Sequence, residues 1–313
     1  MRTVFLDQDS LPVNFRPPHC ASPYVPYGQT MPEDVVGRLA GATIAIVDKV
    51  SLRAEDLAQL PELRLIAIAA TGYDCVDVGY CREHGIAVSN IRHYAMHTVP
   101  EHVFALLLAL RRNLATYAAM GGNEWQRSSQ FCLFGPPIHD LHGSVLGIVG
   151  SGSIGRATAA LGAAFGMRVV FSATPSHPAG ATGRLTLRQL LAEADVLSLH
   201  CPLTPATRGM IGSAELRAMK STSILINTAR GGLVDETALA EALRAGWIAG
   251  AGFDVLSVEP PVDGHPLAAL HQPNFILTPH IAWASEEAMR GLADQLSGNI
   301  QAWAEGAPRN LVP

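Results

Sequence analysis

Two successive series of short apolar runs constrain the fold of this 313-residue chain more than any other feature of its sequence. Each run is apolar throughout, has the length of a strand, and is separated from the next run by a segment of helical length. Strands that lack polar alternation are typical of parallel sheets covered by helices on both faces. Two such series therefore predict two α/β domains.

The two series and the segment between them set the expected domain limits. The first series contains the ranges 3–7, 43–48, 63–70 and 86–90. The second series contains the ranges 145–150, 168–173, 196–201, 223–228, 250–255 and 275–278. Between them, residues 97–114 carry apolar residues at helical spacing, with Pro100 in the expected first turn. We expect one domain over residues 1–98, completed by a returning helix within 286–313, and a second domain over residues 99–285.

Composition excludes several classes of protein. With 48% hydrophobic and 16% charged residues, the chain is expected to be globular rather than disordered. A formal charge of −5 offers no basic field for phosphate backbones, so nucleic acid is not an expected partner. The longest apolar helical run, 103–110, is too short to span a bilayer, and the N-terminus lacks the layout of a signal peptide. The five cysteines have no CxxC spacing, which is typical of reduced thiols in a cytoplasmic protein.

A glycine-rich loop follows the first strand of the second series. The sequence VLGIVGSGSIG places Gly150, Gly152 and Gly155 after a buried strand and at the start of a helix. These glycines permit a tight turn, close approach of the backbone to a pyrophosphate, and close packing of helix on strand. The first-turn N–H groups at Ser153 and Ile154 then face the phosphates. Glycine-rich turns can also serve packing alone, but the strand–loop–helix context favours dinucleotide binding.

The next strand lacks the acid that dinucleotide-binding folds use for the adenosine ribose. In GMRVVFSATPSHP the corresponding positions hold Ser172, Ala173 and Thr174. Without a carboxylate to repel a 2′-phosphate, the site is expected to accept NADP or NAD, with NADPH moderately favoured. Ser176 adds a hydroxyl and His177 a potential cation, whereas nothing in the sequence places Arg184 in the pocket.

Four polar residues follow the later strands of the second series. They are Arg230, Asp254, Glu259 and His280. The carboxyl ends of strands in an open α/β sheet border the ligand crevice, so these side chains are expected to converge at the nicotinamide end of the cofactor.

The residue types suit reduction of a 2-oxo acid. The planar fork of Arg230 can hold the substrate carboxylate, and His280 can donate a proton near neutral pH. Glu259 would stabilise and orient the imidazolium. Each residue also has a structural alternative: a strand cap for Arg230, a surface carboxylate for Glu259 and a core histidine for His280. Their combination beside a dinucleotide loop favours catalysis.

These motifs resemble the D-isomer-specific 2-hydroxyacid dehydrogenases. The resemblance rests on GSGSIG, NTARGGLVDE, AGFDVLSVEPP and LTPHIAWAS, and LIAIAATGYDCVD and HTVPEHVFALLLALRR extend it into the first domain. Within the family, NIRHYAMHTVPEH, WQRSSQFC and HIAWASEEAM are most similar to bacterial glycerate dehydrogenases, also called hydroxypyruvate reductases. The resemblance implies a Rossmann domain, a flavodoxin-like substrate domain, and reduction of hydroxypyruvate or glyoxylate by NAD(P)H.

The resemblance also assigns roles to individual residues. It implies a catalytic triad of Arg230, Glu259 and His280, with His280 as the acid/base. Substrate carboxylate would bind Arg230 and the backbone N–H groups of Thr71 and Gly72. Asp254 would orient the nicotinamide carboxamide. The remaining cofactor contacts would come from Thr228, Ala229, Cys201, Pro202 and Thr207. One departure concerns Ala173, because most members that use NAD carry Asp there.

Other functions remain as alternatives. Formate dehydrogenases share the fold but carry Gln in place of Glu259. A nucleotide-sensing regulator resembling transcriptional corepressors is a non-enzyme alternative, and a dehydrogenase for another 2-hydroxy acid is a third. No metal site is expected, because His139 and His142 lack further ligands nearby in the sequence.

Residues 121–144 fit neither strand nor helix patterns and are expected to form an extended arm. The arm carries Trp125, Phe131 and Phe134, which need a partner surface if they are exposed. A homodimer is therefore expected, and a loop folded back on its own domain is the alternative.

Overall fold

The computed structural model describes residues 1–174, 177–180 and 183–313 and divides into two compact units. One unit comprises Met1–Tyr94 and Ala284–Pro313, and the other comprises Ala95–Trp283. Each unit holds one parallel sheet with helices, so the predicted α/β class is confirmed. The chain leaves and re-enters the first unit a few residues earlier than the limits expected from the sequence.

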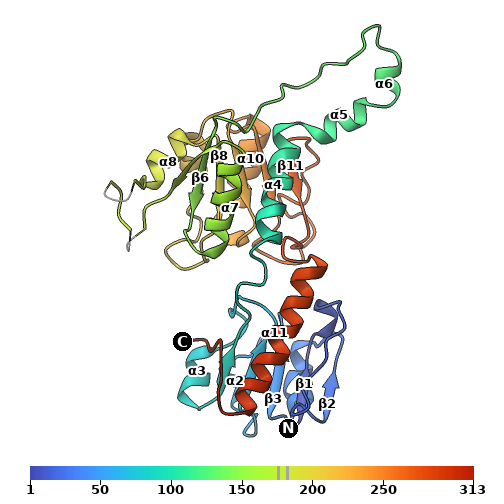
Figure 1. The fold of residues 1–313 in the computed structure, drawn as a ribbon, viewed down its shortest axis with the longest axis vertical. Coiled ribbons are helices and arrows are strands. Elements are labelled where there is room, and N and C mark those ends of the chain that lie inside the picture. The colour runs from blue at the N-terminus through green and yellow to red at the C-terminus, as the bar shows by residue number, and fades with distance from the viewer. Residues whose placement is uncertain (175–176, 181–182) are drawn as a thin grey trace. The chain divides into compact units, whose positions relative to one another are not determined.

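The first unit is built on a five-stranded sheet in the order β2-β1-β3-β4-β5 (Figure 1). All of its strand pairs are parallel, and the order is that of flavodoxin-like folds. Its strands are β1 (Thr3–Phe5), β2 (Tyr24–Pro26), β3 (Ile44–Val47), β4 (Leu65–Ile68) and β5 (Ala87–Ser89). Its helices are α1 (Val35–Leu39), α2 (Ala54–Leu57), α3 (Val78–Glu83) and the returning α11 (Glu286–Ala304).

Strand β2 is not among the strands expected from the sequence. Pro23 and Pro26 flank Tyr24 and Val25, and proline cannot donate to a ladder. The segment is tolerated because β2 is an edge strand that pairs only with β1.

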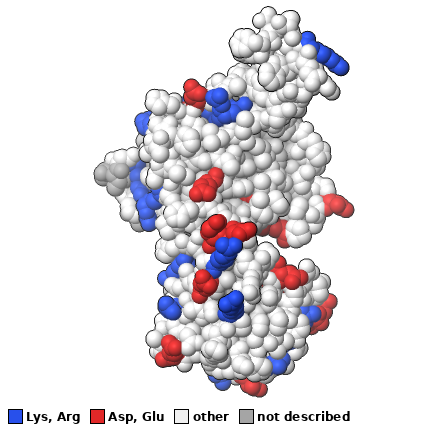
Figure 2. All heavy atoms as spheres, turned by 45° about the vertical axis from the view of Figure 1, so that its right-hand side comes forward, with Lys and Arg blue, Asp and Glu red and all other residues white. Residues whose placement is uncertain are grey.

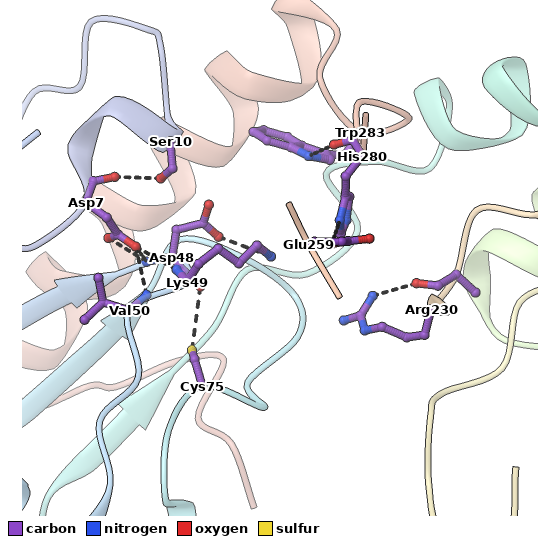
Figure 3. Close-up of polar contacts among 11 residues, drawn as sticks. Asp7, Ser10, Asp48, Lys49, Val50, Cys75, Arg230, Glu259, His280 and Trp283 are labelled. Carbon is purple, nitrogen blue, oxygen red and sulfur yellow. Dashed lines mark hydrogen bonds and ion pairs between the residues drawn. The ribbon is translucent and has the colours of Figure 1, made fainter. Parts of the chain in front are cut away.

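A buried carboxylate fixes the loop that follows β3. The Asp7 side chain accepts hydrogen bonds from the backbone N–H groups of Asp48, Lys49 and Val50 at 2.7–3.1 Å (Figure 3). The Cys75 thiol donates to the Asp48 carbonyl at 3.6 Å, and burial raises the pKa of this thiol to about 11. The loops after β3 and β4 are therefore tied to each other.

The second unit contains a six-stranded parallel sheet in the order β11-β10-β9-β8-β6-β7. Its strands are β6 (Val145–Val149), β7 (Arg168–Phe171), β8 (Val196–Leu199), β9 (Ile224–Asn227), β10 (Gly250–Phe253) and β11 (Phe275–Leu277). Its helices are α4 (Thr98–Arg111), α5 (Leu114–Met120), α6 (Asn123–Gln126), α7 (Ser153–Ala164), α8 (Leu187–Glu193), α9 (Ser213–Ala218) and α10 (Glu236–Ala245). The strand order reverses between β6 and β8, which is where such sheets bind ligands.

Helices cover both faces of this sheet, as fully apolar strands require. One face packs against α4 and α7 and includes Leu107, Leu146 and Ile226. The opposite face packs against α8, α9 and α10 and includes Leu190 and Leu239. Because both faces are buried, only loops and strand ends can carry polar functional groups.

The segment after α4 projects from the second unit as an arm (Figure 1). It begins with α5 and contains the short helix α6, which the sequence did not predict. Among the described residues no single helix is long and apolar enough to cross a membrane. Helices α4 and α5 together reach that length and apolar composition, but the pair is bent by 54°. On the face drawn in Figure 2, acidic and basic side chains are interspersed rather than gathered in one patch.

Candidate active site

The glycine-rich loop joins β6 to α7 at the point where the strand order reverses. Gly150 has φ 105°, and a Cβ there would lie 2.4 Å from the His200 carbonyl oxygen. A Cβ on Gly155 would lie 2.1 Å from the Gly150 carbonyl oxygen, whereas a Cβ on Gly152 would meet no described atom within 4 Å. Gly150 and Gly155 are thus required by packing, whereas Gly152 leaves open space beside the backbone.

The N-terminus of α7 has no side-chain cap among the described residues. By contrast, α8 and α10 are capped by the side chains of Thr186 and Asp235. The first-turn N–H groups of α7, at Ser153 and Ile154, are therefore available to an anion and carry the positive end of the helix dipole. Open space at Gly152 and uncapped N–H groups together fit the pyrophosphate of a dinucleotide.

We expect Gly155→Ala and Gly152→Ala to separate packing from binding. Gly155→Ala forces backbone movement and should lower the free energy of unfolding by about 1–3 kcal/mol, measured by thermal or urea unfolding. Gly152→Ala should leave unfolding unchanged but weaken nucleotide binding at least about tenfold, measured by NAD(P)H fluorescence titration. Equal nucleotide affinity in Gly152→Ala and the parent would contradict a pyrophosphate at this position.

The turn after β9 carries three of the predicted residues: Thr228, Ala229 and Arg230. Buried Asn227 holds this turn, because its amide donates to the Arg230 carbonyl at 2.8 Å and accepts from the Ala229 N–H at 3.1 Å. The Thr228 hydroxyl is buried and has no hydrogen-bond partner among the described residues. A buried hydroxyl without a partner is costly, so this atom fits a contact with bound cofactor. Sequence reasoning missed Asn227, which reads as the polar end of an apolar strand.

Glu259 and His280 form the central polar pair of the second unit. Glu259 Oε2 lies 2.6 Å from His280 Nδ1 (Figure 3). Glu259 Oε1 accepts the Leu256 N–H at 2.7 Å. The carboxylate thus holds one imidazole nitrogen and is itself oriented by the backbone. Nε2 of His280 has no hydrogen-bond partner among the described residues, so it can hold a proton for a substrate.

Asp254 holds the turn that carries His280. Its side chain is 1% exposed and accepts hydrogen bonds from the Thr278 hydroxyl at 2.5 Å and from the N–H groups of Ile281 and Ala282 at 2.9 and 2.8 Å. The His280 N–H donates to the Asp254 carbonyl at 2.8 Å, with His280 at φ 55°. These contacts stabilise a left-handed conformation that non-glycine residues rarely adopt. The role predicted for Asp254 at the nicotinamide carboxamide stays a prediction.

Arg184 lies beside the strand end that lacks an acid. Its guanidinium donates to the Ser172 carbonyl at 3.0 Å and lies 5.3 Å from the centroid of the Phe171 ring. The reason is a parallel bridge between Ser172 and Leu185, reinforced by an Ala173 N–H bond to the Leu185 carbonyl at 2.7 Å. This pairing was not predictable from the sequence.

The structure describes two of the three other predicted hydroxyl and cation positions. Thr174 Oγ1 accepts the His177 N–H at 3.1 Å, so these two residues are hydrogen-bonded to each other. Ser176 lies outside the described residues.

The loop after β8 contains Cys201, Pro202 and Thr207. The Thr207 hydroxyl donates to the Pro202 carbonyl at 2.7 Å, which fixes the loop. Burial raises the pKa of the Cys201 thiol and lowers the pKa of neighbouring His200 to about 4, so neither side chain is charged at neutral pH. The adenosine contacts expected of this loop remain predictions.

Thr71 and Gly72 belong to the first unit and follow β4. The Thr71 hydroxyl donates to the Ile91 carbonyl at 2.8 Å, and its carbonyl accepts the Asn90 amide at 2.8 Å. Within the described part of the chain, their N–H groups have no intramolecular acceptor. Two fixed, free N–H groups in succession fit a carboxylate.

No group of three or more His, Cys, Asp or Glu side chains within residues 1–174, 177–180 and 183–313 is arranged to hold a metal ion. Among proteins that bind a dinucleotide at a parallel sheet, dehydrogenases are the class whose reaction needs a positioned proton donor. The fold, the glycine loop and the Glu259–His280 pair point to that class.

Comparison with known proteins identifies the family. Residues 104–282 match the family D-isomer specific 2-hydroxyacid dehydrogenase, NAD binding domain. The chain is 50% identical to a glycerate dehydrogenase of Methylorubrum extorquens over 99% of this chain and 98% of that protein. This chain belongs to the D-isomer-specific 2-hydroxyacid dehydrogenases.

Solved structures agree. An acyclic imino acid reductase in complex with NADPH and D-Arg superposes with a TM-score of 0.87 at 28% identity, covering 100% of both chains. A D-lactate dehydrogenase from Aquifex aeolicus, complexed with NAD and lactic acid, superposes with a TM-score of 0.81 at 28% identity, covering 98% of this chain and 96% of that one. The predicted fold, family and use of NAD or NADP are confirmed.

Proposed function

We propose that this dehydrogenase reduces a small 2-oxo acid, hydroxypyruvate or glyoxylate, to the D-2-hydroxy acid, D-glycerate or glycolate, with NAD(P)H. The observation that carries the proposal is the 2.6 Å contact between Glu259 and His280 Nδ1, which leaves Nε2 to exchange a proton. The relative at 50% identity is a glycerate dehydrogenase, and the 2-oxo acid that corresponds to D-glycerate is hydroxypyruvate.

Each catalytic side chain has one task in this proposal. The nicotinamide of the bound cofactor supplies the hydride. Arg230 holds the substrate carboxylate with its planar fork, aided by the N–H groups of Thr71 and Gly72. His280 Nε2 gives its proton to the ketone oxygen as the alcohol forms, and Glu259 stabilises the imidazolium that donates it.

Turnover separates an enzyme from a nucleotide sensor. We expect NAD(P)H consumption with hydroxypyruvate or glyoxylate, measured as initial rates at 340 nm across a panel of 2-oxo acids. His280→Ala should lower kcat about 10²–10⁴-fold because the general acid is lost, with nucleotide affinity unchanged. His271→Ala, at an exposed histidine, is the matched control and should keep parental kcat. Nucleotide binding without turnover of any 2-oxo acid would favour the sensor.

NADPH is the proposed preferred donor. Ala173 removes the carboxylate that would repel a 2′-phosphate, and Arg184 places a cation at the same strand end. An arginine to phosphate contact is charge-assisted and stronger than a bond to a ribose hydroxyl. The proposal therefore rests on a missing acid and an added cation, of which only the first is visible in the sequence.

Two variants should reverse this preference independently. Ala173→Asp should raise the KM for NADPH and shift kcat/KM toward NADH. Arg184→Gln should weaken 2′,5′-ADP binding about tenfold and leave 5′-AMP binding unchanged, measured by calorimetry without turnover. Arg188→Gln, at an exposed arginine on α8, is the control. A parent enzyme that prefers NADH by tenfold or more, about 1.4 kcal/mol, would contradict the proposal.

A homodimer formed through the arm is proposed. Phe131 is 90% exposed and Phe134 is 86% exposed, yet the arm is held by its own contacts. Tyr117 accepts from the Gly135 N–H at 3.0 Å and donates to the Pro136 carbonyl at 2.9 Å. These contacts favour a preformed arm for a second copy over a loop packed on its own domain.

Phe131→Asp combined with Phe134→Asp should convert the dimer to a monomer, because charged residues would replace the apolar contact. Sedimentation velocity measures the change. A parent protein that is monomeric at micromolar concentration would contradict the proposal.

We propose a cytoplasmic location from cysteine chemistry alone. Cys20, Cys75, Cys81, Cys132 and Cys201 are all free in the structure, as is usual in a reducing compartment.

A further inference from the structure

A buried carboxylate next to the catalytic loop has no role in the reaction described above. Glu236 is the first residue of α10 and is 8% exposed. Its Oε1 accepts the Ser257 N–H at 2.6 Å, and its Oε2 accepts the Ser257 hydroxyl at 2.5 Å and lies 3.0 Å from His265 Nε2.

The backbone fixes the tautomer of His265. Its Nδ1 accepts the N–H groups of Leu267 and Ala268 at 3.3 and 3.5 Å, so the proton lies on Nε2 and points at Glu236. Glu236 therefore receives three donors, two from Ser257 and one from His265. Burying a carboxylate is costly unless it is hydrogen-bonded in this way.

This cluster is not arranged for nucleophilic catalysis. A nucleophilic serine needs a histidine in contact with its hydroxyl, with the carboxylate behind the histidine. Here the carboxylate lies between the two, and the Ser257 hydroxyl donates to Glu236. The arrangement anchors a loop.

The anchored loop is the one that carries Glu259. Ser257 lies two residues before Glu259, and the Leu256 N–H donates to Glu259 Oε1 at 2.7 Å. On its other side, the loop packs on the backbone of Gly231, where a Cβ would lie 1.9 Å from the Leu256 carbonyl carbon. Gly231 directly follows Arg230, so the contact between Leu256 and Gly231 joins the Glu259 loop to the Arg230 turn.

We propose that Glu236 is a positioning residue that acts through Ser257 to hold Glu259 against His280. The inference rests on the proposed catalytic roles of Glu259 and His280. It extends the site to a side chain that need not touch substrate or cofactor.

A double-mutant cycle between Glu236→Gln and Glu259→Gln tests the coupling. In either amide orientation, Gln turns an N–H₂ group toward a donor of Ser257 or His265, so the loop loses its anchor. Glu236→Gln alone should lower kcat about tenfold, because small misplacements of catalytic groups are costly, while the KM for NAD(P)H stays within about twofold. In the Glu259→Gln background, Glu236→Gln should have almost no further effect on kcat.

Controls separate positioning from loss of stability. Leu243→Ala, in the core on the same helix, should lower the melting temperature but keep kcat and act additively with Glu259→Gln. Ser257→Ala, at an exposed position, keeps the N–H bond and the fold and should lower kcat less than Glu236→Gln. Its effect on kcat should also be non-additive with that of Glu259→Gln. If Glu236→Gln does not fold, Ser257→Ala is the variant that tests the proposal.

The outcomes distinguish two failures. If Glu259→Gln lowers kcat but Glu236→Gln and Ser257→Ala leave it unchanged or act additively, the positioning role is overturned and the proposed function stands. If Glu259→Gln itself keeps parental kcat, the role of Glu259 in the proposed function fails, and the inference fails with it.

Discussion

The geometry of the site depends above all on the buried carboxylate of Asp254. It accepts two backbone N–H groups and one hydroxyl from the 278–282 turn, and it thereby holds His280 at a positive φ. Removing it would leave these donors unsatisfied away from water, at about 1–3 kcal/mol each. The first unit meets the same need with Asp7, which satisfies three N–H groups of the loop after β3. Parallel sheets gather their functional loops at one edge, and buried acids fix those loops.

Three buried polar side chains of the second unit each hold one turn or loop of the site. Asn227 holds the turn of Arg230, Glu236 holds the loop of Glu259, and Asp254 holds the turn of His280. Each accepts or donates hydrogen bonds at backbone atoms of its segment, and these bonds leave Nε2 of His280 without a hydrogen-bond partner among the described residues. A hydride transfer requires alignment within fractions of an ångström, and hydrogen-bonded backbone supplies that alignment better than mobile surface loops.

The sequence predicted what depends on local pattern. Fully apolar runs located the strands other than β2, and the order of strand, glycine loop and helix located the dinucleotide site. What depends on pairing between distant segments was not predictable. β2 is a strand only because β1 pairs with it, and Glu236 resembles an ordinary acid in the first turn of a helix. Nothing in the order of residues shows that its side chain reaches Ser257.

Arg184 illustrates the same limit at the cofactor site. It lies 12 positions after Ser172 in the chain, yet the bridge at Leu185 brings its guanidinium to the end of β7. Contacts with the Ser172 carbonyl and the Phe171 ring fix the guanidinium, and its five N–H donors exceed what one carbonyl can accept. The remaining donors gain most from a dianionic phosphate and little from a neutral hydroxyl. Ala173 contributes no opposing charge at this strand end, which supports the proposed preference for NADPH.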